Sequence, residues 1–450
     1  MIFSFYLNEN ILYIRKTKTA ITSFMKKNNL ILIFLFLSLK FFGQEITAVD
    51  IHSTYLNEIK VVKVFIPDGY EDSRQRYPLT LVIDSETLFD SYVADAKLFS
   101  KNKAVPKQII LGITHFATSN KSRDYGYNVL NSFPHENSMN TLNFIKEELI
   151  PRIKNEYRIA SFKTVVASDL TANFINYFIF DNKPVFSGYI SINPDLAPDM
   201  PVYMKRYASQ IKGDDTYYYM SHGNNTEKKK LEVINSTDVG MIGVSNVYFN
   251  YRFENFKKTN NLISTPQAIA SAMEYVFSMY SPIDDEEFEK NISYLSPLAA
   301  MEYLQYKYEN IEYLFGEKIP IRQEDFVRLE SIVLDQEEGE HLLEYGELAL
   351  KVHPTSPLGN YYNGQFYENS KEYDQALLAY KKGYAKIPES SPKSIGYFMN
   401  IKRILSLQKL EQEALNEPLP AEEIEENSLE DTESTQNIEE TQKETETTEE

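Results

Sequence analysis

The chain has 450 residues, of which 42% are hydrophobic and 13% aromatic, and it contains no cysteine. A chain of this length and composition buries one large core and a smaller one, so it predicts two folded units and excludes a wholly disordered protein. The formal charge of −19 is uneven, because residues 411–450 hold 16 acidic residues against Lys443 alone, a charge of −15 that leaves −4 for the rest. The one run of three basic residues, Lys228 to Lys230, more often forms a solvated loop, so no nucleic-acid partner is expected.

The N-terminal segment has the pattern of a secretory signal peptide that starts inside the given sequence. A basic start, an apolar run and a small-residue cleavage site follow one another at Met25 to Lys27, Leu30 to Leu39 and Phe42 to Gln44. Residues 1–43 are therefore interpreted as an upstream extension plus a signal peptide. No later segment reaches about 18 apolar residues, so we expect an exported mature chain, periplasmic or secreted, with no stable membrane span and no disulfides. A signal anchor is the alternative.

Residues 44–283 alternate short apolar runs with amphipathic stretches, a pattern typical of a βαβ sheet protein. The runs at 79–84 and 108–113 are continuously apolar, as parallel strands covered on both faces require. The sequence thus predicts the α/β class with a doubly wound, mostly parallel sheet. The expected strands are 61–67, 79–84, 108–113, 164–167, 188–192 and 216–220, and the expected helices are 143–157 and 171–180.

Residues 284–410 predict a small all-α unit. Residues at the spacings of one tetratricopeptide repeat are Gly364, Tyr367, Ala376, Tyr380 and Pro388. Ala349 and Pro354 lie 34 residues before Gly383 and Pro388, but only one repeat is convincing. Two amphipathic hairpins that cap the first unit are the alternative. Residues 411–450 lack the apolar content to fold, so a disordered acidic tail is expected.

Several short phrases of the first unit, all in the same chain order, resemble one enzyme family. They are VFIPDGY at 64–70, RYP at 76–78, LVID at 81–84, ILGI at 110–113 with RDY at 123–125, EELIPRIKNEYR at 147–158 and GYISINPDL at 188–196. Together they resemble the esterase family of α/β-hydrolases that includes esterase D and enterochelin esterase, over roughly half of the chain. The resemblance implies the α/β-hydrolase fold and carboxylic-ester hydrolysis, although fold alone does not establish activity.

In that family the nucleophilic serine stands on a sharp strand-to-helix turn, within a phrase such as G-H-S-L-G-G. The matching phrase here is ASDLTA at 167–172, which puts Asp169 at the position of the serine. Using Ser168 instead would shift the turn by one residue and put Val166 and Leu170 on glycine positions, so we disfavour it.

The resemblance also implies an oxyanion hole built from backbone N–H groups. One donor is expected from Leu170, after the turn, and the other from Ser85 or Glu86, after the strand LVID. A carboxylate at Asp169 beside these donors is expected to fill the hole itself, which opposes ester hydrolysis.

The family's histidine lies in a late loop of the form H-x-S-x-P, and this histidine is missing. The loop is recognisable in NNLISTPQAIASAMEYVF at 260–277, where Leu262 holds the histidine position and Asn261 is its polar neighbour. Neither side chain accepts and returns a proton near neutral pH. The acidic member of the triad is expected at Asn225 or Glu227.

A relocated base has to come from another histidine. His115 follows a predicted strand at the edge where open α/β sheets bind ligands, and His222 follows another. His135 is a further candidate to reach the cleft. His52 precedes the first clear strand, and the remaining two histidines belong to the helical unit.

The sequence therefore favours a pseudo-esterase that binds a small ligand in its cleft or a partner protein on its helical module. One alternative is an active hydrolase in which Asp169 attacks carbon, as the elbow aspartate of haloalkane dehalogenases and epoxide hydrolases does, with a relocated histidine activating water. Another is an assembly factor that acts through its helical module. No H-E-x-x-H or cofactor-binding pattern is present, so neither a metal nor a cofactor is expected.

Overall fold

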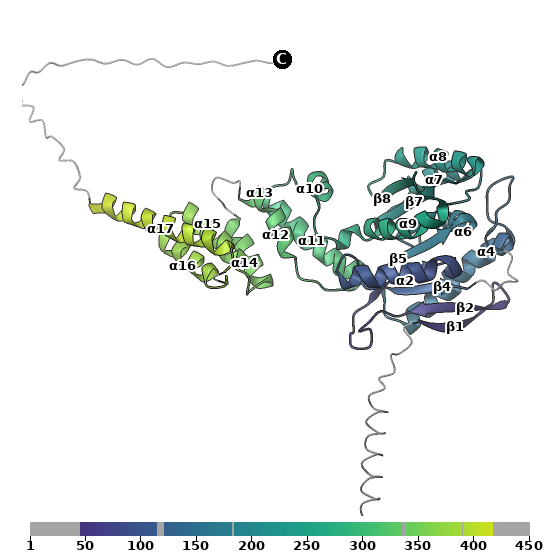
Figure 1. The fold of residues 1–450 in the computed structure, drawn as a ribbon, viewed down its shortest axis with the longest axis horizontal. Helices are drawn as coiled ribbons and strands as arrows, with labels where there is room; N and C mark the ends of the chain where they lie inside the picture. Colours follow the sequence, from purple (N-terminus) through teal and green to yellow (C-terminus); the bar gives the residue numbers. More distant parts are fainter. Residues whose placement is uncertain are drawn as a thin grey trace, which may run out of the picture.

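The structure is a computed structural model that describes residues 46–114, 121–181, 184–334, 339, 341–388 and 390–416. Figure 1 shows an α/β part built around one sheet and an arm of helices that extends from it. The elements of the α/β part are β1 (Ile46–Ser53), β2 (Glu58–Phe65), β3 (Tyr77–Val82), α2 (Ser85–Lys101), β4 (Ile109–Ile113), α3 (Lys121–Tyr125), α4 (Glu136–Asn143), η1 (Phe144–Leu149), α5 (Ile150–Glu156), β5 (Ile159–Ser168), α6 (Asp169–Phe174), η2 (Ile175–Phe178), β6 (Gly188–Ile192), α7 (Met200–Ala208), β7 (Thr216–Gly223), α8 (Lys228–Ile242), β8 (Phe249–Phe256), α9 (Asn261–Val276) and η3 (Ser278–Tyr280). The helices of the arm are α10 (Asp285–Asn291), α11 (Pro297–Phe315), α12 (Gln323–Arg328), α13 (Glu330–Val333), α14 (Leu342–Val352), α15 (Leu358–Asn369), α16 (Tyr373–Tyr384) and α17 (Lys393–Asn416).

The eight described strands form one sheet in the order β1-β2-β4-β3-β5-β6-β7-β8. β1 and β2 are antiparallel to their neighbours, and β3 to β8 run parallel. The prediction of an α/β class with a mostly parallel sheet is therefore confirmed. The carboxyl ends of the parallel strands all lie at one edge, where open α/β sheets bind their ligands.

Both faces of the sheet are covered by helices. One core packs α2 and α9 against the sheet through residues such as Phe89, Tyr92 and Met273. The other core includes Ile145 from η1 and Met204 from α7. Two covered faces explain the continuous apolar runs of the central strands.

The segment 143–157, predicted as one continuous helix, is divided into three helical segments. The chain forms α4, then the wider π turn η1, and then α5, with Pro151 in the first turn of α5. Proline lacks a backbone donor and crowds the preceding turn, which the π turn accommodates. The expected helix at 171–180 starts two residues early, at Asp169, and ends in the 3₁₀ turn η2.

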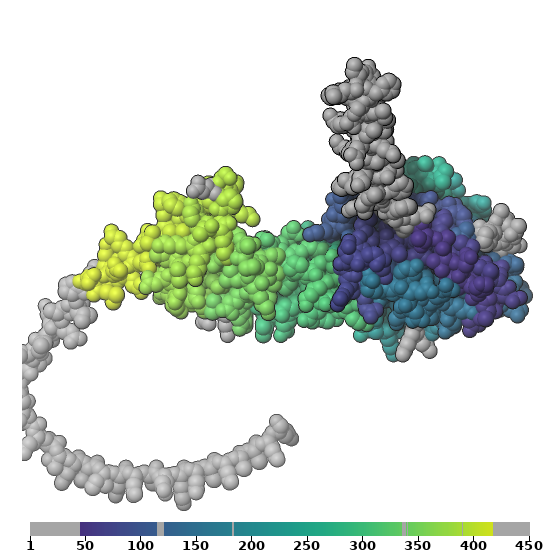
Figure 2. All heavy atoms as spheres, turned by 90° about the horizontal axis from the view of Figure 1, so that it is seen from below, coloured from purple at the N-terminus to yellow at the C-terminus, as the bar shows by residue number. Residues whose placement is uncertain are grey.

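The helical arm is attached at the amino ends of the strands. α11 lies against β3 and β5, and Phe162 near the start of β5 contacts Phe277 and Phe315 with ring centroids 5.6 and 5.2 Å apart. One core continues from the sheet through α11 to Tyr362 in α15. Figure 2 shows the arm joined to the α/β part without a break. The two parts therefore share apolar packing.

The outer arm consists of consecutive helices that pack on one another. Tyr345 of α14 contacts Tyr362 of α15 at 4.9 Å between ring centroids, and Tyr380 of α16 contacts Tyr397 of α17 at 6.5 Å. A helical C-terminal region is thus confirmed, while its assignment to tetratricopeptide repeats stays a prediction.

Residues 411–416, which the sequence assigned to the acidic tail, are helical. α17 continues to Asn416, because residues 411–416 (EQEALN) are mostly good helix formers. Residues 1–45, with the expected signal peptide, and residues 417–450 lie outside the described part of the chain. Among the helices that the structure describes, none is long and apolar enough to cross a membrane.

Candidate functional site

Asp169 stands on a sharp turn between β5 and α6. Its backbone φ is 53°, in the left-handed region that non-glycine residues seldom adopt, though aspartate tolerates it better than most. Ser168 caps α6 in a capping box with Thr171, and the neighbouring Ala167 and Ala172 are fully buried. The Asp169 side chain is 66% exposed. This is the local geometry of a nucleophile elbow, with a carboxylate in place of the hydroxyl.

The Asp169 carboxylate is held by a lysine that the sequence did not connect with it. Lys230, in the first turn of α8, lies 2.8 Å from Asp169 Oδ1 and 3.1 Å from Asp195 Oδ2. Partial burial opposes the charge of Lys230, but the hydrogen bonds to both carboxylates outweigh it and raise the pKa of the ammonium. We expected the Asp169 carboxylate to fill the oxyanion hole. The structure instead pairs this carboxylate with Lys230 of α8.

A second carboxylate, which sequence reasoning missed, contacts the elbow. Asp84 follows β3 and is 1% exposed, and its Oδ2 accepts hydrogen bonds from Ser168 N and Ser168 Oγ, both at 3.1 Å, and from Thr171 Oγ1. Its Oδ1 forms an ion pair with Lys121 Nζ. The aspartate of the phrase LVID was the available signal. Asp84 ties the start of α2 to the first turn of α6.

The three residues expected to supply oxyanion donors lie at these two helix starts. Ser85 and Glu86 are the first two residues of α2, and Leu170 is the second residue of α6. Ser85 is buried. None of the three is among the residues that line the cavity described next.

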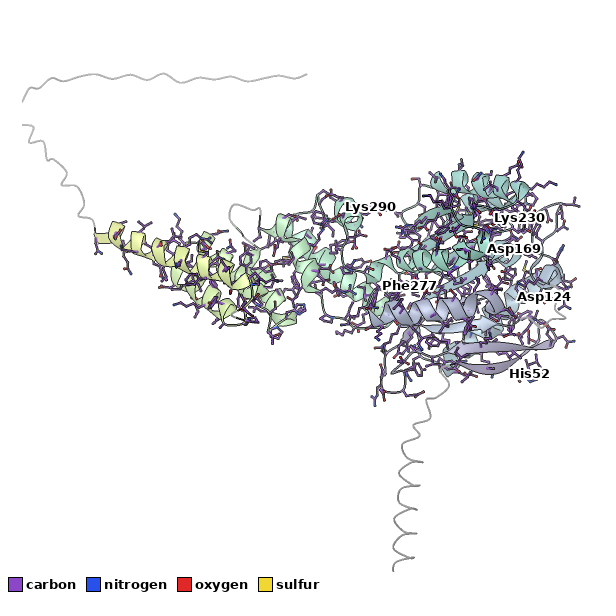
Figure 3. All side chains as sticks on the ribbon, in the orientation of Figure 1. His52, Asp124, Asp169, Lys230, Phe277 and Lys290 are labelled. Atoms are coloured by element: carbon purple, nitrogen blue, oxygen red, sulfur yellow. The ribbon has the colours of Figure 1, made fainter. Side chains whose placement is uncertain are left out.

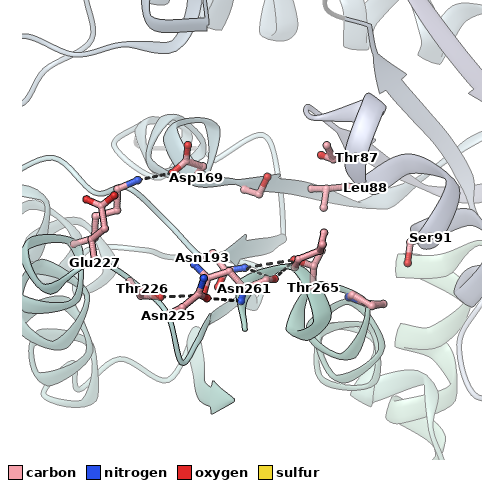
Figure 4. Close-up of a pocket in the computed structure, with 14 residues that line it drawn as sticks. Thr87, Leu88, Ser91, Asp169, Asn193, Asn225, Thr226, Glu227, Asn261 and Thr265 are labelled. Carbon is pink, nitrogen blue, oxygen red and sulfur yellow. Dashed lines mark hydrogen bonds and ion pairs between the residues drawn. The ribbon is translucent and has the colours of Figure 1, made fainter. Parts of the chain in front are cut away.

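A cavity of about 670 Å³ opens at the carboxyl ends of the strands. Figure 4 shows Asp169 and Glu227 on one side of it and α2 on another. The cavity brings together five of the predicted site residues, Asp169, Asn225, Glu227, Asn261 and Leu262. Its lining is mainly polar and contains no aromatic ring: Thr87, Leu88, Ser91, Ser168, Asp169, Asn193, Asn225, Thr226, Glu227, Lys230, Asn261, Leu262, Thr265 and Pro266.

The segment predicted as a late loop is the start of helix α9. Asn260 caps this helix by accepting a hydrogen bond from Ile263 N at 2.9 Å. Leu262 lies in the first turn, is 80% exposed and lines the cavity. The asparagine cap, whose side chain satisfies a backbone donor of the first turn, explains the difference. The position at which the resemblance places the histidine is therefore an aliphatic part of the cavity wall.

Asparagine and threonine side chains form a network beneath Leu262. Asn261 N donates to Asn225 Oδ1 at 2.7 Å, and Asn261 Oδ1 accepts from Thr226 Oγ1 at 3.2 Å. Asn193, whose φ is 47°, accepts from Gly223 N at 2.9 Å. Of these residues, the sequence indicated only Asn225 and Asn261. The network fixes this wall of the cavity.

His222 does not reach the cavity. β7 extends to Gly223, three residues beyond the expected end, so His222 is a strand residue with its side chain packed on the sheet. It is 3% exposed, its Nδ1 lies 2.8 Å from Gly223 O, and its ring packs near Phe253. The expectation that His222 reaches the cleft is therefore not met.

The other histidines give no base at the elbow within the described chain. His135 precedes α4 and is exposed, and His52 lies in β1, a strand that the sequence did not predict. His115 lies outside the described residues. Among the residues that the structure describes, no histidine lines the cavity.

The comparisons with known proteins show the fold. No protein-family model matches the sequence, and no curated protein matches it. An uncharacterised protein from Capnocytophaga ochracea is similar in structure with a TM-score of 0.64 at 24% identity, over 81% of this chain and 99% of that chain. An IroE-like serine hydrolase from Shewanella oneidensis has a TM-score of 0.51 at 16% identity, over 76% of this chain and 100% of that one. The α/β part thus has the α/β-hydrolase fold, and it is followed by a helical C-terminal region.

Proposed function

We propose that this chain is an exported pseudo-esterase: an α/β-hydrolase body that binds a ligand or a partner in its cavity without Ser-His chemistry. The observation that carries the proposal is the cavity lining. The elbow position is Asp169, whose carboxylate is bound to Lys230, and the histidine position is Leu262. Acyl transfer needs a base that removes and returns a proton at the elbow, and an aliphatic side chain supplies none.

The charges around the elbow also oppose ester hydrolysis. A tetrahedral intermediate carries a negative oxygen, which active esterases stabilise with preorganised donors, and the loss of one such donor costs about 10² to 10³ in rate. Here two carboxylates are close to the elbow. Asp84 accepts a hydrogen bond from Ser168 N, and Asp169 is itself the residue of the turn. Lys121 and Lys230 each pair with one of these carboxylates, so neither lysine is a free countercharge for an oxyanion.

The same cavity is suited to binding. Its asparagine oxygens accept internal hydrogen bonds, which leaves the amide N–H groups of Asn225 and Asn261 available as donors at the wall. Leu88, Leu262 and Pro266 add apolar surface. Fixed hydrogen-bond donors beside apolar surface are typical of ligand sites.

The test is hydrolysis of a short-chain p-nitrophenyl ester by the chain from Gln44 onward. We compare the unchanged chain with Asp169→Ser, with Asp169→Ser plus Leu262→His, and with the matched control Asp169→Ser plus Leu262→Gln. The expected result is that only the histidine-containing double variant gains activity. The glutamine control separates a proton-transfer effect from a change in polarity at residue 262.

Turnover by the unchanged chain that Asp169→Asn abolishes would contradict the proposal and favour an active hydrolase. An active hydrolase needs a relocated base, and His115 is one of the histidines that the sequence offers. His115→Gln would then test that residue, because it should abolish turnover if His115 is the base. Deletion of residues 285–410 would be the simplest test of the alternative that the protein is an assembly factor, but its result could not be assigned to the helical arm alone. Phe315 of α11 packs on Phe162 of the sheet, so that deletion would also damage the α/β part.

A further inference from the structure

Helix α17, the last helix of the arm, is apolar on two opposite faces. Its inner face buries Tyr397 and Ile404, and the Tyr397 hydroxyl donates to Pro357 O at 2.7 Å. Its outer face carries five large apolar side chains, each between 45% and 67% exposed, at helical spacings: Ile395, Phe398, Met399, Leu405 and Leu410. Figure 1 shows α17 at the far end of the arm. Stacked helical arrays normally end in a polar outer face, whereas this face carries five large apolar side chains.

The outer face is also basic. Lys402 and Lys409 lie on it at the same helical spacing, and Lys402 Nζ lies 4.6 Å from the centroid of the Phe398 ring. Lys409 Nζ lies 3.4 Å from Glu413 Oε1 of the same helix, an exposed pair that contributes about 0–1 kcal/mol and leaves the lysine accessible to another carboxylate. The surrounding stretch, residues 375–410, holds seven basic residues against Glu389 alone, in a chain whose net charge is −19. The seven are Lys381, Lys382, Lys386, Lys393, Lys402, Arg403 and Lys409. A segment that covers this face must combine negative charge with apolar side chains.

The sequence that follows α17 has that combination. Residues 417–450, 34 in all, contain 14 acidic residues and Lys443, with four aliphatic residues among them: Leu419, Ile424, Leu429 and Ile438. Pro418 and Pro420 stand directly after the helix, where proline favours a change of direction. The outer face from residue 395 to 410 is about 22 Å long at 1.5 Å per residue, well within the reach of this segment.

We propose that residues 417–450 turn back and dock on the outer face of α17, with aliphatic side chains against Phe398, Met399 and Leu405 and carboxylates near Lys402 and Lys409. A second copy of the chain is a poorer occupant, because it would bring the lysines of two outer faces together. Attachment to the same chain gives the segment a high effective concentration at the face, so weak contacts suffice.

The absence of cysteine makes a direct test practical. A spin label is attached at Ser406→Cys, an exposed outer-face position between Lys402 and Lys409, and methyl signals of Ile424, Leu429 and Ile438 are recorded in the full chain from Gln44. At low salt we expect these signals to broaden, and at about 0.5 M salt to recover in part, since screening weakens exposed ion pairs. The matched control label at Ser209→Cys, exposed at the end of α7, should leave them sharp.

Lys402→Glu with Lys409→Glu should abolish the broadening, while the matched pair Lys257→Glu with Lys258→Glu, in the α/β part, should preserve it. Circular dichroism of each variant shows whether α17 and its neighbours remain folded. The proposal is overturned if the signals stay sharp at low salt with the Ser406→Cys label. It is also overturned if broadening arises between molecules, in a mixture of spin-labelled and separately isotope-labelled chains. The test does not involve the cavity, so its outcome is independent of the proposed function.

Discussion

Replacing Asp169 by valine should destabilise the protein through the backbone of the elbow. The φ of 53° costs an ordinary L-residue about 1–2 kcal/mol, and a branched Cβ makes valine one of the worst residues there. Valine also removes the ion pair with Lys230, but Asp169 is 66% exposed and such a pair contributes about 0–1 kcal/mol. Asp169→Asn loses the same ion pair and keeps a residue that tolerates left-handed backbone. The free energy of unfolding should therefore be lower for the valine variant than for the asparagine variant by about 1–2 kcal/mol.

The assay is urea unfolding followed by circular dichroism and tyrosine fluorescence, since the chain has no tryptophan. Asp90→Val serves as the matched control, because Asp90 is exposed in the interior of α2 with ordinary helical backbone, where the same exchange changes stability by less than about 0.5 kcal/mol. If valine costs the same at positions 169 and 90, the elbow is not held in the left-handed region. The identification of the turn as a nucleophile elbow would then fail.

Two further pairs of variants test the arm and the buried carboxylate. Gly364→Ala should destabilise the arm by about 1–3 kcal/mol, because the added Cβ would lie 2.4 Å from the Tyr380 ring. The added Cβ of Gly396→Ala on α17 meets nothing within 4 Å, so this change should stabilise the helix by about 0.5–1 kcal/mol. Hydrogen exchange of α15 and α17 amides measures both, and a shift of equal sign for the two would contradict the packing described here. Asp84→Asn should lower the free energy of unfolding by about 2 kcal/mol, because it removes charge-assisted hydrogen bonds to the elbow. Lys121→Met should lower it by less, because the Lys121 side chain is half exposed. Equal losses for the two variants in urea unfolding would contradict the role given to Asp84.

The central strands were predictable because burial on both faces forces continuous apolar runs such as 79–84. β1 and β8 were missed because they lie at the two edges of the sheet and mix polar with apolar residues, so neither gives a continuous run. The start of α9 was mistaken for a loop because the family resemblance outweighed the capping signal of Asn260. Local patterns thus identified the central strands, which are buried on both faces, and failed at the edge strands, where burial is partial.

Motif spacing located part of the candidate site. Asp169 and Leu262 were placed by phrases of fixed order, and the cavity brings both together. Lys230 was missed because it lies 61 residues from Asp169 in a basic run that resembles a solvated loop. Asp84 was missed as a partner of Ser168 for the same reason, since the two residues lie 84 positions apart in the sequence. Both contacts exist only because parallel strands end at one edge of the sheet, which no local pattern encodes.

The cavity and the outer arm lie at opposite ends of the sheet. Figure 3 shows Asp169 and Lys230 at one end of the α/β part and Phe277, next to the arm, at the other. Phe277 and Phe315 pack on Phe162 near the amino end of β5, whereas Asp169 follows its carboxyl end. Energetic coupling between the two ends needs an element that can adopt two discrete arrangements. The sheet between them is close-packed on both faces, so it does not switch readily between two arrangements. Changes at Asp169 and changes at Lys402 and Lys409 should therefore have additive effects on the free energy of unfolding. The lysine changes should leave ligand binding in the cavity unaffected. Asp169→Asn should leave the broadening of the signals from residues 417–450 unaffected.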